Sequence, residues 1–231
     1  MDLDTVPTVP VHLHRRRNPG TSTAGPVSAW TAAQVEALMA ETFERHGRLD
    51  LLVNNGGGQF PQAAIDYSVK GWNAVIDTNL NGTWWMMQAA ARRWRDCGQQ
   101  GSIVNIVANV WRGMPQVAHT CAARAGVIYL SKSVAVEWAP LGIRVNCVSP
   151  GSIATEGLNV YPPGAAERFG DANPMRCYGD AYDIAQAVLY VGLPITGKFI
   201  TGEVLVVDGG NQLWGDVWPG GMPDWFRVSQ R

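Results

Sequence analysis

The chain has 231 residues, of which 46% are hydrophobic and 16% are charged, and its formal net charge is −1. This length and composition predict one globular domain with a substantial core and exclude a disordered chain. The small net charge excludes a global field that would recruit nucleic acid or an anionic membrane surface.

Residues 1–28 differ from the rest of the chain in being rich in Pro, Thr, Ser, His and Arg. The stretch VPVHLH is the part of this segment that could form a strand, and its prolines restrict such a strand to a sheet edge. The basic run HRRRNPG is short and adjoins Pro and Gly, which favours a solvated loop over a nucleic-acid site. We therefore expect a loose segment before the folded domain.

From Trp30 onward, helical and strand patterns alternate along the chain. The helical period predicts a first helix that Thr31 caps and Gly47 ends. The apolar run LDLLVNN then predicts a buried parallel strand that leads into the turn-forming NNGGG. The later elements predicted are helices over 72–94, 117–142 and 180–192, and strands over 101–110, 143–151 and 200–210.

This alternation predicts an α/β fold, a Rossmann-like doubly wound parallel sheet with helices on both faces. Ligands of such sheets bind beyond the carboxyl ends of the strands. Polar and glycine-rich residues fall at four such ends, which predicts a binding rim, although loops are polar by default. The four stretches are 54–58, 107–109, 150–155 and 208–210.

Four segments in this order resemble the short-chain dehydrogenase/reductase family over roughly residues 30–214: NNGG at Asn54, TNLNG at Thr78, RVNCVSPG at Arg144 and ITGEVLVVDGG at Ile200. The stretches LVNNGGGQF and HTCAARAG look most like the enoyl-CoA reductase branch, typified by peroxisomal trans-2-enoyl-CoA reductase and related to the 2,4-dienoyl-CoA reductases. The resemblance implies an oxidoreductase domain over 29–214 that uses NADP(H) or NAD(H) to reduce an enoyl-CoA-type double bond.

The resemblance also implies cofactor-binding positions on the rim. Asn54, Asn55, Gly56 and Gly57 match residues beside the adenosine half of the cofactor, and a tight turn is their plainer role. A second set borders the nicotinamide in the family, where Thr155 accepts from the carboxamide or only caps the next segment. This set consists of Pro150, Gly151 and Thr155.

Asn79 matches a family asparagine that holds a water near the active-site lysine. Its alternative role is to bond the main chain where a helix is locally disturbed, and both roles are compatible. Asp208, Gly209 and Gly210 are expected to be structural, as a turn that closes the sheet.

The catalytic helix departs from the family pattern. Where the family carries Tyr-x-x-x-Lys, this chain has Thr120 and Arg124, which share a helix face. A threonine hydroxyl does not ionise usefully near neutral pH, and Arg124 stays charged, so it can hold a ribose hydroxyl but cannot transfer a proton. Val107 stands where the family keeps a serine.

Tyr129 and Lys132 are three residues apart, not four, and we expect a packed tyrosine and a surface lysine rather than a catalytic pair. His119 and Cys121 flank Thr120 off its face and are weak candidates for an acid. Enoyl reduction needs only donors for a transient oxyanion and a proton for the α-carbon. Thr120 and Asn109 are the candidate donors, together with a water.

The family's glycine-rich phosphate-binding turn has no counterpart in this chain, so two βα units and a third strand are expected to be missing and LLVNN is expected to form a sheet edge. The alternatives to an active reductase are a catalytically inactive subunit that only binds or assembles, and a truncated fragment.

Further expectations concern the protein's surroundings. The spacing of the four cysteines matches neither a metal site nor a disulfide scaffold, and we expect a reducing cytoplasm. A small-molecule substrate such as an acyl-CoA is expected, without nucleic acid or membrane. A homo-oligomer is expected through the helices near 71–95 and 117–138. The Trp-, Pro- and Gly-rich extension at 215–231 covers a cleft or a neighbouring subunit, or packs on the surface.

Overall fold

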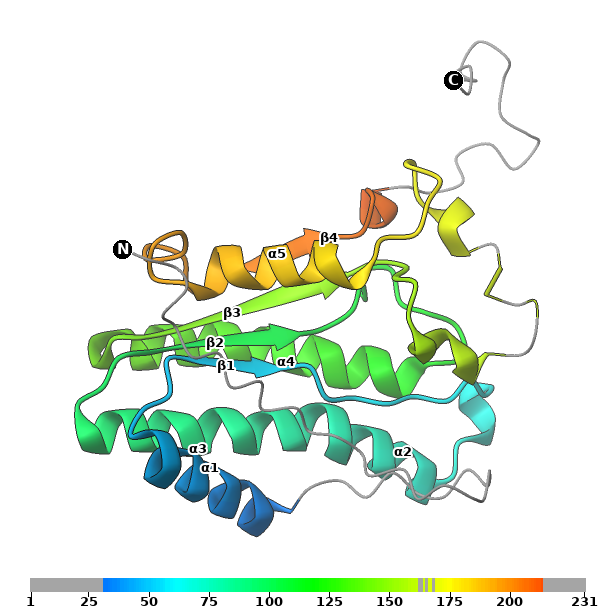
Figure 1. Ribbon diagram of the computed structural model, residues 1–231. Coiled ribbons are helices and arrows are strands. Elements are labelled where there is room, and N and C mark those ends of the chain that lie inside the picture. The colour runs from blue at the N-terminus through cyan, green and yellow to red at the C-terminus, as the bar shows by residue number, and fades with distance from the viewer. Residues whose placement is uncertain (1–30, 162–163, 165, 168, 214–231) are drawn as a thin grey trace.

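The computed structural model describes residues 31–161, 164, 166–167 and 169–213 (Figure 1). The segments predicted over 1–28 and 215–231 lie outside these residues. The described α-helices are α1 (Ala32–His46), α2 (Val69–Ile76), α3 (Gly82–Cys97), α4 (Ala118–Trp138) and α5 (Ala181–Gly192). The described strands are β1 (Leu51–Asn54), β2 (Gly101–Ile106), β3 (Ile143–Pro150) and β4 (Val204–Val207).

The four strands form one parallel sheet in the order β1-β2-β3-β4. Leu52 pairs with Ile103, which in turn pairs with Val145, so the strands keep their apolar residues in register across the sheet. The α/β fold with a Rossmann-like parallel sheet is therefore confirmed. The carboxyl ends of all four strands meet at one edge, where the candidate site lies (Figure 1).

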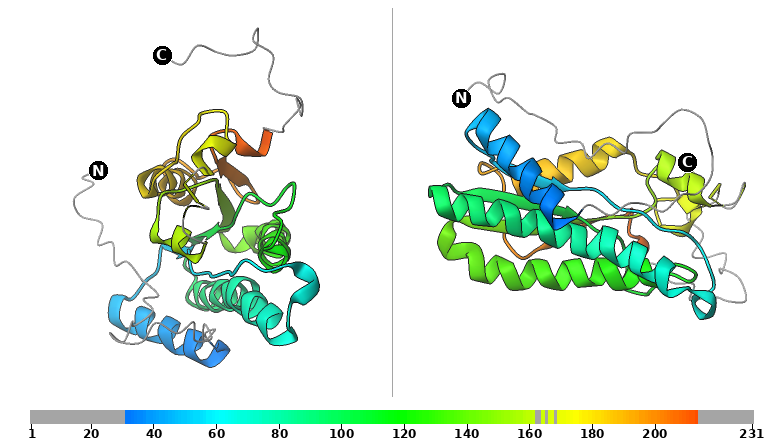
Figure 2. Two further views of the ribbon diagram at one scale, coloured as in Figure 1. Left: turned by 90° about the vertical axis from the view of Figure 1, so that its right-hand side faces the viewer. Right: turned by 90° about the horizontal axis from the view of Figure 1, so that it is seen from below.

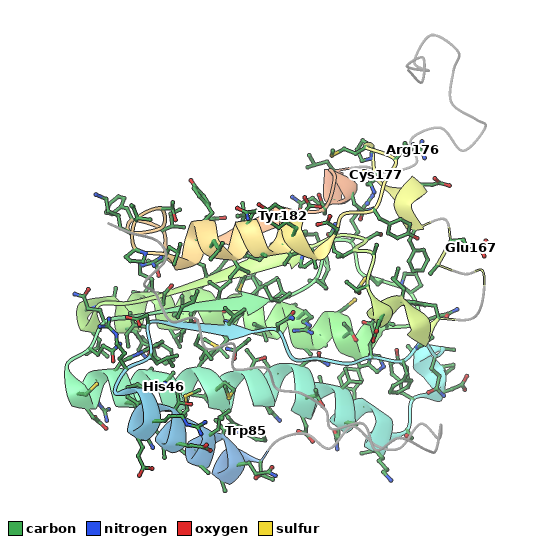
Figure 3. All side chains as sticks on the ribbon, viewed as in Figure 1. His46, Trp85, Glu167, Arg176, Cys177 and Tyr182 are labelled. Carbon is green, nitrogen blue, oxygen red and sulfur yellow. The ribbon has the colours of Figure 1, made fainter. Side chains whose placement is uncertain are left out.

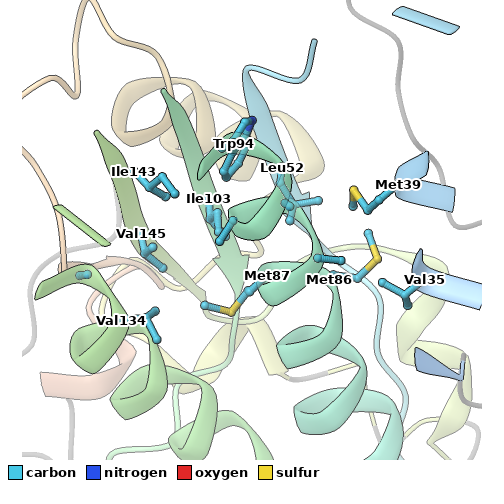
Figure 4. Packing of buried hydrophobic residues seen from close by; sticks show 14 residues of the cluster. Val35, Met39, Leu52, Met86, Met87, Trp94, Ile103, Val134, Ile143 and Val145 are labelled. Carbon is cyan, nitrogen blue, oxygen red and sulfur yellow. The ribbon is translucent and has the colours of Figure 1, made fainter. Parts of the chain in front are cut away.

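Helices cover both faces of the sheet (Figure 2). On one face, α1, α3 and α4 enclose a core in which Met86, Met87 and Trp94 pack against the sheet (Figure 4). On the other face, α5 packs its buried residues Ala187 and Val191 against the middle of the sheet. Burial of the strands on both faces explains why they read as continuous apolar runs.

The first helix begins and ends as predicted. Thr31 and Gln34 form a capping box at its start, and Gly47 adopts a left-handed φ of 70° at its end. The helix predicted over 72–94 differs from the observed one, because a π-helical turn, Asp77–Asn81, separates α2 from α3. The sequence carries no periodic signal for this turn, which places Asn79 inside the fold.

Strand β1 is the edge of the sheet in the described part of the chain, as predicted. It pairs with β2 on one side, and Val53 remains 38% exposed. No helix in the described residues is long and apolar enough to cross a membrane. Those residues also contain no cluster of His, Cys, Asp and Glu side chains that could hold a metal ion.

Candidate active site

The loop after β1 brings a glycine against a half-buried cation. A side chain on Gly57 would place its Cβ 2.1 Å from Arg124 Nη2 and 2.6 Å from Asn79 Oδ1, so any larger residue here would displace these two side-chain groups. Arg124 reaches this position from α4, and its Nη1 donates to the Ile106 carbonyl at 2.7 Å. Gly57 and Arg124, two predicted site residues, are therefore in direct contact at the carboxyl edge of the sheet.

Burial lowers the pKa of Arg124 to about 10, which still leaves the guanidinium charged at neutral pH. Because Nη1 is bound to a carbonyl and Nη2 lies against Gly57, the group is fixed in orientation. A fixed cation with further N–H donors can bind a hydroxyl or an anionic oxygen, but it cannot release a proton. The role predicted for Arg124, which is to hold a ribose hydroxyl, stays a prediction.

Asn79 ties the π-helical turn to the next residue of the same loop. Its Nδ2 donates to the carbonyls of Gly58 at 2.8 Å and Val75 at 2.9 Å, and its Oδ1 accepts from the Gly58 N–H at 3.2 Å. Bonding of the main chain at a helix disturbance, one of the two predicted roles, is confirmed. The water-holding role stays a prediction.

Gln59 and Phe60 continue the same loop and contact two more parts of the site. The Gln59 amide donates to the Tyr161 hydroxyl at 2.8 Å, from the segment after β3. The Phe60 ring lies edge-on to His119, with the ring centroids 4.6 Å apart. Each residue of the loop over 57–60 therefore contacts a different part of the site. Tyr161 is not among the residues predicted from the sequence, because the family motifs do not reach it.

His119 is fully buried in an aromatic box. Its ring stacks on Tyr67 with the centroids 4.6 Å apart and an interplanar angle of 4°, and Phe60, which contacts both rings, lies edge-on to it. Desolvation lowers the pKa of His119 and outweighs the main-chain carbonyls of Phe60 and Val117, which favour the charged form. The neutral imidazole is a part of the core, which leaves it poorly suited to act as an acid.

Thr120 is turned toward this box. It is only 3% exposed, its N–H donates to His119 Nδ1 at 2.8 Å, and its hydroxyl lies 3.3 Å from the same nitrogen. The Nδ1 atom therefore accepts the Thr120 N–H. Thr120 thus occupies the expected helix position, while its hydroxyl already has a neighbour inside the protein.

The Asn54 side chain does not lie on the rim. It is buried and donates to Asn105 Oδ1 at 2.8 Å, and Asn105 donates to Ser131 Oγ at 2.9 Å. This chain of bonds links β1, β2 and α4 beneath the site. Asn55 and Gly56, in contrast, are exposed at the end of β1.

The loops after β3 and β4 lie close together. A Cβ on Gly151 would fall 2.6 Å from Asp208 Cα, so this glycine permits the two loops to pack. Asp208 accepts from the Gly210 and Gln212 N–H groups and from Asn109 Nδ2, which confirms its structural role and occupies Asn109.

Two more predicted residues lie at the end of β3 and in the loop that follows it. Pro150 is the last residue of the strand and is half-buried. Thr155 is exposed and makes no side-chain cap for the segment Glu156–Val160, so the capping alternative is wrong.

The prediction of a packed Tyr129 is wrong. Tyr129 is 65% exposed on the outer face of α4, and Lys132 Nζ lies over its ring at 5.1 Å. The pair is a surface cation–π contact away from the rim, which agrees with its exclusion from catalysis. Val107, in place of the family serine, is buried and packs in the core.

The buried histidine predicts a pH dependence of stability. Because the pKa of His119 is lower in the folded protein than its ordinary value of 6.5, the unfolded chain binds more protons below that pH. Stability is therefore complete above about pH 6.5 and falls as the pH drops below it. Denaturant titrations between neutral and mildly acidic pH should show a smaller loss for His119→Asn than for the wild type. His46→Gln, on the exposed last turn of α1 (Figure 3), should lose as much stability with falling pH as the wild type does. An equal loss of stability in all three proteins would contradict this account.

Comparison with known proteins finds relatives over most of the chain. The sequence profile of a family described as Enoyl-(Acyl carrier protein) reductase matches residues 16–212. A probable 2,4-dienoyl-CoA reductase of Bacillus subtilis is 37% identical over 181 residues, which cover 76% of this chain and 71% of that protein. A peroxisomal 2,4-dienoyl-CoA reductase of Danio rerio is 36% identical over 205 residues, covering 84% of this chain and 67% of that protein.

Solved structures give the same result. A short-chain dehydrogenase from Bacillus anthracis superposes with a TM-score of 0.74 at 36% identity, covering 80% of this chain and 74% of that one. ElxO with NADP bound superposes with a TM-score of 0.73 at 31% identity, covering 79% of this chain and 75% of that one. With its parallel sheet, its rim loops and these matches, the chain belongs to the short-chain dehydrogenase/reductase family.

Proposed function

We propose that the protein is a nicotinamide-dependent reductase that acts on an enoyl-CoA-type double bond. The carrying observation is the Arg124 guanidinium, held against Gly57 at the carboxyl edge of the sheet while no tyrosine occupies its helix face. Such a site offers fixed positive charge and hydrogen bonds without a side chain that ionises usefully. Relatives named 2,4-dienoyl-CoA reductases at 36–37% identity support this class of substrate.

The described residues fit one part of a nicotinamide cofactor. Arg124 would hold a ribose hydroxyl, exposed Asn55 and Gly56 would border the adenosine half, and Pro150, Gly151 and Thr155 would border the nicotinamide. The Gly57 backbone packs directly against Arg124 and Asn79, because there is no space for a Cβ between them. The NADP named for the ElxO structure supports the same cofactor class. When bound, the reduced nicotinamide would supply a hydride.

The protein's own part in this reaction is to bind and orient. Addition of hydride at the β-carbon moves negative charge onto the thioester oxygen, which hydrogen-bond donors then stabilise. Arg124 adds a positive potential nearby, and the proton for the α-carbon comes from water. Ketone reduction places greater demands on an acid, so we expect little of it from this site.

A second candidate is a subunit that binds the nucleotide without turnover. Two predicted donors favour it, because Thr120 is buried beside His119 and the Asn109 amide is bound to Asp208. We also propose a cytoplasmic homo-oligomer. Exposed Tyr129 and Val136 on α4 support self-association, and the free cysteines of the described residues support a reducing compartment.

Cofactor binding and turnover separate these functions. The wild type should bind NADPH or NADH in a fluorescence titration, and Arg124→Met should weaken this by roughly tenfold, the value of a charged hydrogen bond. Arg45→Met removes an exposed arginine of α1 and should leave the affinity unchanged. Loss of nicotinamide absorbance is expected with crotonyl-CoA or a 2,4-dienoyl-CoA, and little with acetoacetyl-CoA. Absence of binding at high micromolar concentration would exclude the reductase, and binding without oxidation would favour the second candidate.

A further inference from the structure

The donors predicted from the sequence are committed to the protein itself. The Thr120 hydroxyl lies 3.3 Å from His119 Nδ1 in a buried position. Asn109 Nδ2 donates to Asp208 at 2.8 Å and to Asn211 at 3.1 Å. A substrate oxygen that gains charge at the rim therefore needs another donor.

Tyr161 offers a phenol at the same rim. Its oxygen accepts the Gln59 Nε2–H at 2.8 Å, which leaves its own O–H free to donate to a second group. Its ring lies edge-on to Phe169 with the centroids 5.1 Å apart, so the side chain is held from two sides. Gln59 comes after Gly57 and Gly58, which contact Arg124 and Asn79 respectively.

The loop over 57–60 thus links this phenol to the fixed cation, because a single residue, Gly58, separates the Gln59 that binds Tyr161 from the Gly57 that contacts Arg124. Desolvation raises the pKa of Tyr161, although the Gln59 hydrogen bond partly opposes it. The phenol therefore stays protonated at neutral pH, which suits a group that donates a hydrogen bond without releasing its proton. Tyr161 comes from the segment after β3, whereas the family tyrosine comes from the helix that corresponds to α4.

We propose that Tyr161 donates a hydrogen bond to the thioester oxygen of the substrate, and that Gln59 positions it. This inference rests on the proposed reductase function and deepens it. The reduced nicotinamide would give up the hydride and be oxidised. A C–H bond then forms at the β-carbon, the double-bond electrons move to give an enolate, and a solvent proton forms the C–H bond at the α-carbon. Tyr161 keeps its proton throughout, so the step consumes one hydride and one proton.

Removal of the phenol oxygen tests the assignment. Tyr161→Phe should lower kcat for crotonyl-CoA by about 10²-fold, the effect of losing one oxyanion donor, with NADPH affinity unchanged. Gln59→Leu should lower kcat less, because the phenol remains but is no longer held. Tyr182→Phe is the matched control, since Tyr182 is 69% exposed on α5 (Figure 3). A thermal melt of each variant checks that it folds.

A second readout needs no turnover. Calorimetry with crotonyl-CoA and with free CoA should show that Tyr161→Phe lowers the affinity for crotonyl-CoA by roughly threefold to tenfold. The affinity for free CoA should stay unchanged. If the wild type binds crotonyl-CoA more tightly than Tyr161→Phe does but oxidises no NADPH, the reductase proposal fails while the assignment of Tyr161 stands. Equal crotonyl-CoA binding by the two proteins, or a wild-type kcat in Tyr161→Phe, overturns the assignment.

Discussion

Replacing Arg144 by Met is expected to lower the free energy of unfolding by about 3 kcal/mol. The Arg144 side chain starts on β3 and ends among the last carbonyls of α5 and the loop behind it. Its Nη2 donates to Gly192 at 2.7 Å, and its Nη1 donates to Val191 and Gly197, both at 2.6 Å, with Ile200 at 3.3 Å. Removal leaves four carbonyls without this donor and takes a positive charge from the negative end of a helix.

Urea denaturation measures this effect through the midpoint at an unchanged slope. Arg45→Met is the matched control, because its contact with Glu41 spans 3.9 Å on an exposed helix face, and it should cost less than about 0.5 kcal/mol. Arg144→Lys should fall between the two, since one ammonium group cannot reach all four carbonyls. Equal stabilities for Arg144→Met and Arg45→Met would show that the hydrogen bonds of Arg144 contribute nothing to the free energy of unfolding.

Replacing Gly57 by Val is expected to weaken nicotinamide binding by at least about tenfold while the fold is retained. The new Cβ would fall 2.1 Å from Arg124 Nη2 and 2.6 Å from Asn79 Oδ1, so both site groups must move. The loop itself is exposed, which lets the backbone absorb part of the strain and keeps the cost in stability modest.

Gly98→Ala gives the control for strain alone. Gly98 ends α3 with a φ of 67°, so alanine there lowers stability, yet it should leave cofactor affinity unchanged. A double-mutant cycle with Arg124→Ala identifies the mechanism, because Gly57→Val should cost much less affinity once the guanidinium is gone. A full additive loss in the double variant would contradict displacement of Arg124.

The sequence predicts the fold from local signals that the structure retains. Thr31 and Gly47 mark the limits of α1 because capping depends on adjacent residues alone. Thr120 and Arg124 can be identified because a family motif fixes their spacing. The depth of Thr120 could not be predicted, because it depends on His119, Tyr67 and Phe60 meeting across different elements.

Other differences have the same physical origin. The exposure of Tyr129 depends on which face of α4 is covered, and its sequence neighbours do not reveal this. The inward turn of Asn54 depends on Asn105 and Ser131, which are 51 and 77 residues away in sequence. Tyr161 lies outside every family motif in the chain, and its one pointer is a hydrogen bond to Gln59 across 102 residues.

The position of α5 on the opposite face has a topological consequence. The connections β1-α3-β2 and β2-α4-β3 each step one strand across the sheet with their helices on one face. The connection β3-α5-β4 takes the same step with its helix on the other face, so its handedness is reversed. Parallel crossovers are overwhelmingly right-handed, which makes this last one the uncommon, left-handed kind. The Arg144 guanidinium binds the main chain where that crossover turns back toward the sheet. It therefore stabilises the left-handed connection that strand twist disfavours.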